Sequence, residues 1–107
     1  MPSSTRASTC TQGLKDQQRD AFRRFAAADG RAARALEGCI EYCFCEDVAD
    51  PRRVLLYEEW ATRDAFESYK VSPVFEAGAA RLQPMLAEAP KSAYFESDDL
   101  FSACAVR

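Results

Sequence analysis

The sequence predicts an α+β domain with elements in the order β-α-β-β-α-β and one antiparallel sheet. Three observations predict this class. The chain has 107 residues, which is room for one domain with one core. Two neighbouring stretches, residues 39–46 and 54–60, alternate in side-chain character with the period of a strand. Apolar side chains at helical spacing come before and after this pair of strands.

The chain is expected to begin with a short strand. Residues 6–12 read R-A-S-T-C-T-Q, and their β-branched threonines favour a strand. Gly13 ends this pattern. Residues 1–5 are interpreted as a disordered lead-in and residues 98–107 as a C-terminal tail of the same single domain.

An amphipathic helix of about 20 residues is expected from Leu14 onward. Its apolar stripe consists of Phe22, Phe25, Ala32, Ala33 and Leu36. Asp29-Gly30 interrupts the stripe, so we expect the helix to kink or restart there. Gly38 stands where the helix is expected to stop.

The two central strands are expected to have distinct faces, because side chains alternate along a strand. In residues 39–46 one face carries Ile40, Tyr42 and Phe44, and the other carries Cys39, Glu41, Cys43 and Cys45. In residues 54–60 one face carries Val54, Leu56, Glu58 and Trp60, and the other carries Leu55, Tyr57 and Glu59. Asp50-Pro51 is expected to form the turn between these strands.

The second helical region is expected to start at Thr62, whose side chain can cap a helix. Ser72-Pro73 interrupts this region, and Pro73 stands at the favoured first position of a new helix. Pro84 is expected to bend or end that helix. Residues 91–97 (K-S-A-Y-F-E-S) are expected to form the last strand.

This order is the ferredoxin-like arrangement, a four-stranded antiparallel sheet that we expect to carry its helices on one face. The other face would expose the apolar side chains of one strand parity to water. A second copy of the chain would cover them, so the sequence predicts a homodimer.

Composition excludes several classes of function. The net charge is −3, so the chain has no strongly basic face for a nucleic acid. No apolar run approaches the roughly 20 residues that span a bilayer, so we expect no membrane association. The N-terminus lacks the apolar stretch of a secretory signal, so we expect a cytoplasmic protein. The chain has no histidine, which removes the usual general base and the commonest nitrogen ligand for metals.

The five cysteines are expected to be thiols, because disulfides are rare in the cytoplasm. Cys39, Cys43 and Cys45 share one predicted strand face, which suggests a metal site. Their spacing is not that of a zinc site, however, and a strand would spread the sulfur atoms too widely. The favoured interpretation is small buried side chains with no metal.

Short motifs follow one another in a fixed order through the middle of the chain. They are Gly38-Cys39-Ile40-Glu41-Tyr42, Asp50-Pro51, Leu56-Tyr57-Glu58-Glu59-Trp60, Ala65-Phe66 and Ser72-Pro73-Val74-Phe75. This order resembles the antibiotic biosynthesis monooxygenase family, and the resemblance covers about residues 14–97. It implies a dimeric α/β barrel with a cavity between sheet and helices. It also implies oxygenation of electron-rich phenols, quinols or anthrones by O2 without metal or flavin.

Three residues are candidate catalytic groups under this resemblance. Trp60 corresponds to the family's tryptophan and would line the cavity and offer its indole N–H to a substrate oxygen; the alternative is a core aromatic. Glu58 lies on the same predicted face and is the candidate base, and the favoured alternative is a structural ion pair, for example with an arginine of the partner copy. Tyr69 stands where family members frequently have histidine, and its phenol could donate a hydrogen bond.

Four further residues are candidate substrate-binding groups: Tyr42, Leu56, Phe66 and Phe75. The three aromatic residues could form a wall for a flat substrate, although plain core packing is the commoner role of such side chains. Leu56 stands where the family's aromatic oxygenases have an asparagine, and the histidine of the haem-degrading relatives is absent.

These observations leave three functions open. The first is a cofactor-independent monooxygenase that oxidises a small quinol or polyphenol with O2. The second is a non-catalytic dimer that binds a small aromatic or apolar ligand. The third is a structural dimer with a collapsed core.

Overall fold

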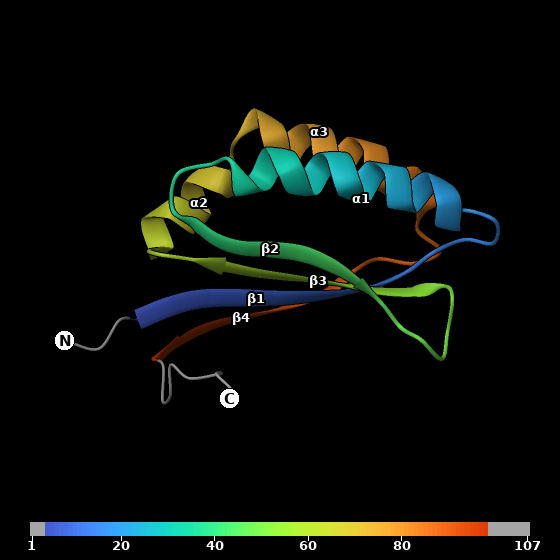
Figure 1. The fold of residues 1–107 in the computed structure, drawn as a ribbon, viewed down its shortest axis with the longest axis horizontal. Coiled ribbons are helices and arrows are strands. Elements are labelled where there is room, and N and C mark those ends of the chain that lie inside the picture. Colours follow the sequence, from blue (N-terminus) through green and yellow to red (C-terminus); the bar gives the residue numbers. More distant parts are fainter. Residues whose placement is uncertain (1–3, 99–107) are drawn as a thin grey trace, which may run out of the picture.

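The computed structural model describes residues 4–98, and side chains from residue 7 to residue 96. The elements are β1 (Ser4–Gly13), α1 (Arg19–Arg34), β2 (Cys39–Glu46), β3 (Arg53–Trp60), α2 (Arg63–Lys70), α3 (Pro73–Leu82), the short 3₁₀ turn η1 (Gln83–Met85) and β4 (Lys91–Asp98). The strands form one antiparallel sheet in the order β2-β3-β1-β4 (Figure 1). This arrangement confirms the predicted α+β, ferredoxin-like fold.

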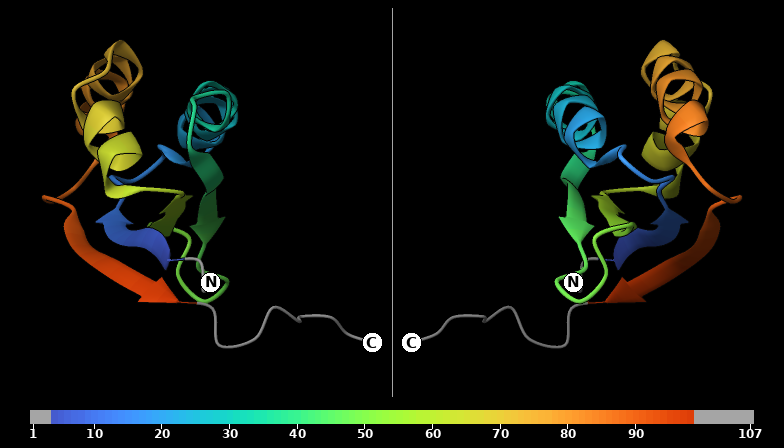
Figure 2. Two further views of the ribbon diagram at one scale, coloured as in Figure 1. Left: turned by 90° about the vertical axis from the view of Figure 1, so that its left-hand side faces the viewer. Right: turned by 90° about the vertical axis from the view of Figure 1, so that its right-hand side faces the viewer.

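All three α-helices lie on one side of the sheet, and no helix of the described chain covers the other side (Figure 2). We call these two sides the inner and the outer face. The strand register places Ala7, Thr9, Thr11, Cys43, Cys45, Leu55, Tyr57, Glu59, Ala93 and Phe95 on the outer face. Two clusters of buried side chains lie between the inner face and the helices, one around Trp60 and one around Phe22.

The first strand is longer than predicted. β1 begins at Ser4, so Ser4 and Thr5 belong to the sheet and not to a lead-in. β4 likewise includes Asp98, which we had assigned to the tail. Residues 1–3 and 99–107, the rest of the predicted lead-in and tail, lie outside the described residues.

The first helix differs from its prediction in two ways. It starts at Arg19 because Leu14 extends the strand region, where it pairs with Leu86 and is buried. It also continues without a break through Asp29 and Gly30, so the predicted kink is wrong. Asp29 does not disrupt the helix because its carboxylate has a buried hydrogen-bond partner outside the helix.

Strand parity failed at the start of β2. The pairing of β2 with β3 contains a bulge between Cys39 and Glu41, and a bulge adds one residue to the alternation. Cys39 therefore packs against the core, and Ile40, predicted to share a face with Tyr42, is 57% exposed. Cys43 and Cys45 remain on the outer face, with their sulfur atoms 3.7 Å apart as free thiols.

The predicted signals around the two short helices are confirmed. Thr62 Oγ1 accepts a hydrogen bond from the Ala65 N–H and caps α2. Ser72 Oγ accepts one from the Phe75 N–H and caps α3, which begins at Pro73. Pro84 lies in the 3₁₀ turn that follows α3. No described helix has the length and apolar character needed to cross a bilayer.

Replacing Gly38 by alanine is expected to destabilise the fold by at least about 1–2 kcal/mol. Gly38 has a φ of +86°, and an added Cβ would lie 2.5 Å from the Ala65 Cβ, so both the backbone and the packing oppose a side chain. Urea denaturation measures the loss. Gly30→Ala is the matched control, because Gly30 is helical and its Cβ would meet only the tip of Arg34. Equal midpoints for the two variants would contradict this prediction.

Candidate active site

A cavity of about 200 Å³ lies between the inner face of the sheet and the helices. Its wall is largely aromatic, with Phe25, Tyr42, Phe44, Phe66, Tyr69, Phe75 and Tyr94 among the lining residues. Two buried carboxylates, Asp29 and Glu58, also line it. An apolar cavity with a few converging polar groups is the usual form of a small-molecule site.

Glu58 brings a buried carboxylate from β3 to the cavity wall. The side chain is 5% exposed, and its Oε1 accepts a 2.8 Å hydrogen bond from Trp60 Nε1. Burial raises the pKa of Glu58, and the nearby charge of Asp29 adds to the rise, while the Trp60 hydrogen bond opposes it. No described cation of the same chain lies within salt-bridge distance of Glu58, so the ion pair of the favoured alternative would require an arginine of a second copy. A carboxyl group with a raised pKa is suited to accept a proton near neutral pH.

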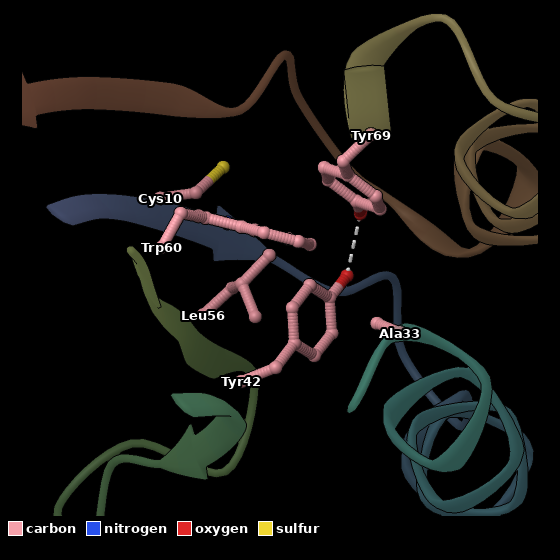
Figure 3. Close-up of a cluster of buried hydrophobic side chains, with 6 residues drawn as sticks. All are labelled: Cys10, Ala33, Tyr42, Leu56, Trp60 and Tyr69. Atoms are coloured by element: carbon pink, nitrogen blue, oxygen red, sulfur yellow. Dashed lines mark hydrogen bonds between the residues drawn. The ribbon is translucent and has the colours of Figure 1, made fainter. Parts of the chain in front are cut away.

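Trp60 does not itself line the cavity but packs against side chains that do, among them Leu56 and Tyr69 (Figure 3). Its indole stacks on the ring of Tyr69, with centroids 5.0 Å apart and planes 24° apart. Its N–H donates to Glu58, so in this structure it is not offered to a substrate oxygen as the sequence had led us to expect. Trp60 thus holds the positions of Glu58 and Tyr69.

A second set of polar groups in the cavity wall is linked by hydrogen bonds from α1 through β2 to α2. Tyr42 Oη donates a 2.9 Å hydrogen bond to Asp29 Oδ2. Tyr42 Oη also lies 2.8 Å from Tyr69 Oη, a hydrogen bond that Figure 3 shows. Burial raises the pKa of Asp29, although the Tyr42 hydrogen bond and the charge of Arg81 oppose the rise. Burial likewise raises the pKa of both phenols, so both remain protonated near neutral pH.

Two polar atoms of β1 face this cavity without a direct partner. Ser8 Oγ and Gln12 Oε1 are buried and have no hydrogen bond within the described part of the chain. Ser8 is opposite Glu58 in the register, and the proximity of its hydroxyl lowers the pKa of that carboxyl, although the contact does not meet hydrogen-bond geometry. Because an unpaired buried polar atom is costly, these two atoms are suited to hydrogen-bond a ligand.

Four residues are shared by the cavity and a neighbouring surface groove. Ser8, Phe66, Lys70 and Tyr94 line both the cavity and a groove of about 340 Å³ on the surface. The rings of Phe66 and Tyr94 lie 5.5 Å apart, and Lys70 Nζ lies 5.2 Å and 5.6 Å from their centroids. Phe66, Tyr94 and Lys70 therefore form the entrance from the groove to the cavity, and the Lys70 ammonium is a cation at that entrance.

Six of the seven residues singled out from the sequence line this cavity: Tyr42, Leu56, Glu58, Phe66, Tyr69 and Phe75. Trp60 does not line it. Sequence reasoning missed Ser8, Gln12 and Asp29. The spacing Phe22-Phe25-Asp29-Ala33-Leu36 is itself helical, so a carboxylate within the apolar stripe was the signal for Asp29. The signal for Ser8 and Gln12 was the alternation of the strand, which places them on the same face as the buried Cys10.

The stability of the fold is expected to fall as the pH rises above the ordinary carboxyl range. The pKa of Asp29 and that of Glu58 are both raised, so the folded state holds their protons more tightly than the unfolded chain does. This stabilisation is complete below the ordinary pKa values of 3.8 and 4.5 and is lost as the pH rises through the raised values. Urea midpoints measured across about pH 4 to pH 8 should decline less steeply in Asp29→Asn than in the wild type. An Asp29→Asn profile as steep as the wild-type profile would contradict the assignment, and Asp20→Asn on the exposed start of α1 is the control.

Comparisons with known proteins agree with the fold. A sequence profile described as antibiotic biosynthesis monooxygenase matches residues 12–81. A comparison with curated proteins found no match. A solved structure from Nitrosomonas europaea, named as a candidate antibiotic biosynthesis monooxygenase, has a TM-score of 0.83 at 17% identity and covers 92% of each chain. One from Deinococcus radiodurans, with the same designation, has a TM-score of 0.83 at 19% identity and covers 94% of this chain and 99% of that one. The matches support a monooxygenase-like or small-ligand-binding role, and the chain belongs to the antibiotic biosynthesis monooxygenase family.

Proposed function

We propose that the protein is a cofactor-independent monooxygenase that oxidises a small quinol or polyphenol with O2. One observation carries the proposal: an aromatic-lined cavity that contains a buried carboxylate with a raised pKa and two unpaired polar atoms of β1. The aromatic wall suits a flat ring, Glu58 suits the acceptance of a phenolic proton, and Ser8 and Gln12 suit its orientation. Neither a metal nor a flavin has a part in this proposal.

The size of the cavity favours a substrate with one aromatic ring. An engineered apolar cavity of about 150 Å³ in another protein holds one benzene molecule. The 200 Å³ here therefore fits one ring with small substituents. A three-ring anthrone would require the walls to move.

The proposed reaction starts with the transfer of a hydroquinone proton to Glu58. The anion passes one electron to O2, and the resulting semiquinone and superoxide form a C–O bond at a ring carbon. The distal peroxide oxygen receives the proton from Glu58. Loss of the C–H proton from that carbon and cleavage of the O–O bond then release the distal oxygen as water. In sum, hydroquinone and O2 give hydroxyquinone and water, and the largely aromatic walls limit the access of solvent to the intermediates.

Oxygen uptake with substrates of increasing size tests this proposal. We expect hydroquinone to be oxidised faster than 1,4-naphthohydroquinone, and anthrone not to be oxidised above the protein-free rate. Catalase added to each assay removes the contribution of hydrogen peroxide from spontaneous oxidation. A wild-type protein that accelerates none of the three reactions would refute the oxygenase.

A non-catalytic small-ligand-binding protein is the second candidate. It is favoured by the hydrogen bond that engages the Trp60 indole N–H with Glu58, and by Leu56 where the family's aromatic oxygenases have an asparagine. In that case a phenol would bind without oxygen consumption. Calorimetric titration with 4-methoxyphenol in the absence of O2 distinguishes this function from the loss of any site.

The proposal includes a homodimer in the cytoplasm. The outer face carries Cys43, Leu55 and Tyr57, all only partly exposed, and Phe95, which is 50% exposed. A second copy packed on this face would bury these side chains and complete the barrel that the resemblance implies. Sedimentation equilibrium should give a mass twice the 11.9 kDa of the chain, and a monomer at micromolar concentration would refute the dimer.

A further inference from the structure

Three buried side chains from three elements form a continuous hydrogen-bonded chain at the cavity. Asp29 comes from α1, Tyr42 from β2 and Tyr69 from α2. The contact between Asp29 Oδ2 and Tyr42 Oη is 2.9 Å, and that between Tyr42 Oη and Tyr69 Oη is 2.8 Å. All three residues also line the cavity, so a bound ligand can reach the chain.

The direction of these hydrogen bonds follows from their chemistry. An ionised carboxylate can only accept hydrogen bonds, so the Tyr42 hydroxyl donates its one hydrogen bond to Asp29. The Tyr42 oxygen then accepts a hydrogen bond from the Tyr69 hydroxyl. The one O–H group of Tyr69 is therefore used in this hydrogen bond, and no other described side chain donates a hydrogen bond to Tyr69 Oη. Its oxygen is therefore ready to accept a hydrogen bond from a hydroxyl group in the cavity.

The far end of the chain reaches a second groove, about 280 Å³ in volume, between α1 and α3. Asp29 lines this groove as well as the cavity, together with Gly78 and Arg81. A Cβ on Gly78 would lie 2.6 Å from Asp29 Oδ1, so only a glycine leaves the carboxylate its place at the helix crossing. Asp29 thus connects the interior with the surface, and Arg81 is a cation near it.

We propose that Tyr69, Tyr42 and Asp29 form a proton relay that accepts the proton of a second substrate hydroxyl, separately from Glu58. The inference rests on the proposed oxygenase function and assigns its substrate class, a dihydric phenol. In the step, the substrate O–H proton moves to Tyr69, the Tyr69 proton to Tyr42 and the Tyr42 proton to Asp29. One O–H bond breaks and one forms at each phenol, and the net change is one proton from substrate to Asp29. The hydroxyquinone is then formed as its anion, which balances the proton that leaves through Asp29. The groove between α1 and α3 then gives that proton a route to solvent.

Hydroquinone and 4-methoxyphenol test the relay as a matched pair, because the ether lacks the second ionisable hydroxyl. We expect wild type to oxidise hydroquinone with a kcat/KM about 10²-fold above that of 4-methoxyphenol. In Tyr42→Phe and in Asp29→Asn this ratio should fall to within about threefold, mainly through slower hydroquinone oxidation. The variant with both substitutions should oxidise hydroquinone no more slowly than either single variant, because each substitution alone already interrupts the relay. Asp20→Asn, the same chemical change as Asp29→Asn but on the exposed start of α1, is the control that should keep the wild-type ratio.

Several outcomes would overturn the relay. It fails if the variants slow both phenols equally, which is the mark of a merely structural role, or if the ratio is unchanged. If wild type oxidises neither phenol, the oxygenase proposal fails, and anaerobic calorimetry then decides the relay. Hydroquinone should bind about fivefold more tightly than the ether to wild type and equally to Tyr42→Phe, since one hydrogen bond contributes about 1 kcal/mol. The same binding preference in both proteins would overturn it.

Discussion

Glu58→Gln is expected to lower kcat for hydroquinone by about 10²- to 10⁴-fold, the usual contribution of a positioned general base. Glutamine keeps the size of the side chain and an oxygen that can accept the Trp60 N–H bond, but it cannot take up a proton. Stopped-flow absorbance of the quinone product measures the rate. The binding of 4-methoxyphenol should change by less than about threefold, because the lost group acts on the reaction rather than on binding.

Glu59→Gln is the matched control for this variant. Glu59 is the next residue of β3, but it lies on the outer face, where its carboxylate accepts a 2.8 Å hydrogen bond from the Tyr57 hydroxyl. It should react at the wild-type rate. A Glu58→Gln protein as fast as Glu59→Gln would remove Glu58 from the chemistry and leave the second carboxylate, Asp29, as the acceptor in the cavity.

Trp60→Ala is expected to destabilise the fold by about 3–5 kcal/mol, the usual cost of removing a large buried aromatic side chain. The indole is 1% exposed and stacks on Tyr69, and its N–H stabilises the buried carboxylate of Glu58. Truncation therefore creates a void and also removes the donor of a buried charge. The free energy of unfolding in urea measures the loss.

Trp60→Phe separates these two contributions. Phenylalanine retains much of the aromatic packing but has no N–H group, so its cost should be about 1–3 kcal/mol, that of an unsatisfied buried acceptor. The loss should shrink at acidic pH, where the Glu58 carboxyl is protonated. A Trp60→Ala protein within about 1 kcal/mol of wild type would contradict the structural role assigned to the indole.

The sequence was sufficient to predict the architecture because its strands and helices have regular periods. Alternation along residues 54–60 correctly placed Leu56 and Glu58 on the face that lines the cavity. The same rule failed at Cys39 and Ile40, because a bulge shifts the alternation without changing the composition of the strand.

The candidate site was predicted less completely, because its polar groups depend on contacts between distant elements. Asp29 looks like an interruption of a helix until Tyr42, 13 residues away on β2, becomes its partner. The sequence predicts that Trp60 lines the cavity, but Trp60 is not among the lining residues, and its indole N–H donates to Glu58, two residues earlier on the same strand. Which of two acceptors receives a hydrogen bond depends on side-chain geometry that strand parity does not encode.

Isotope labelling tests the central claim most directly, namely that the cavity catalyses the insertion of an O2 oxygen atom into a one-ring quinol. Wild-type protein and hydroquinone are allowed to react under ¹⁸O2, and the hydroxyquinone is reduced at once and analysed by mass spectrometry. The proposed reaction predicts one ¹⁸O atom in the product and the other in water, with no hydrogen peroxide formed. An unlabelled quinone together with hydrogen peroxide would contradict it, because electrons would then have passed to O2 without a C–O bond.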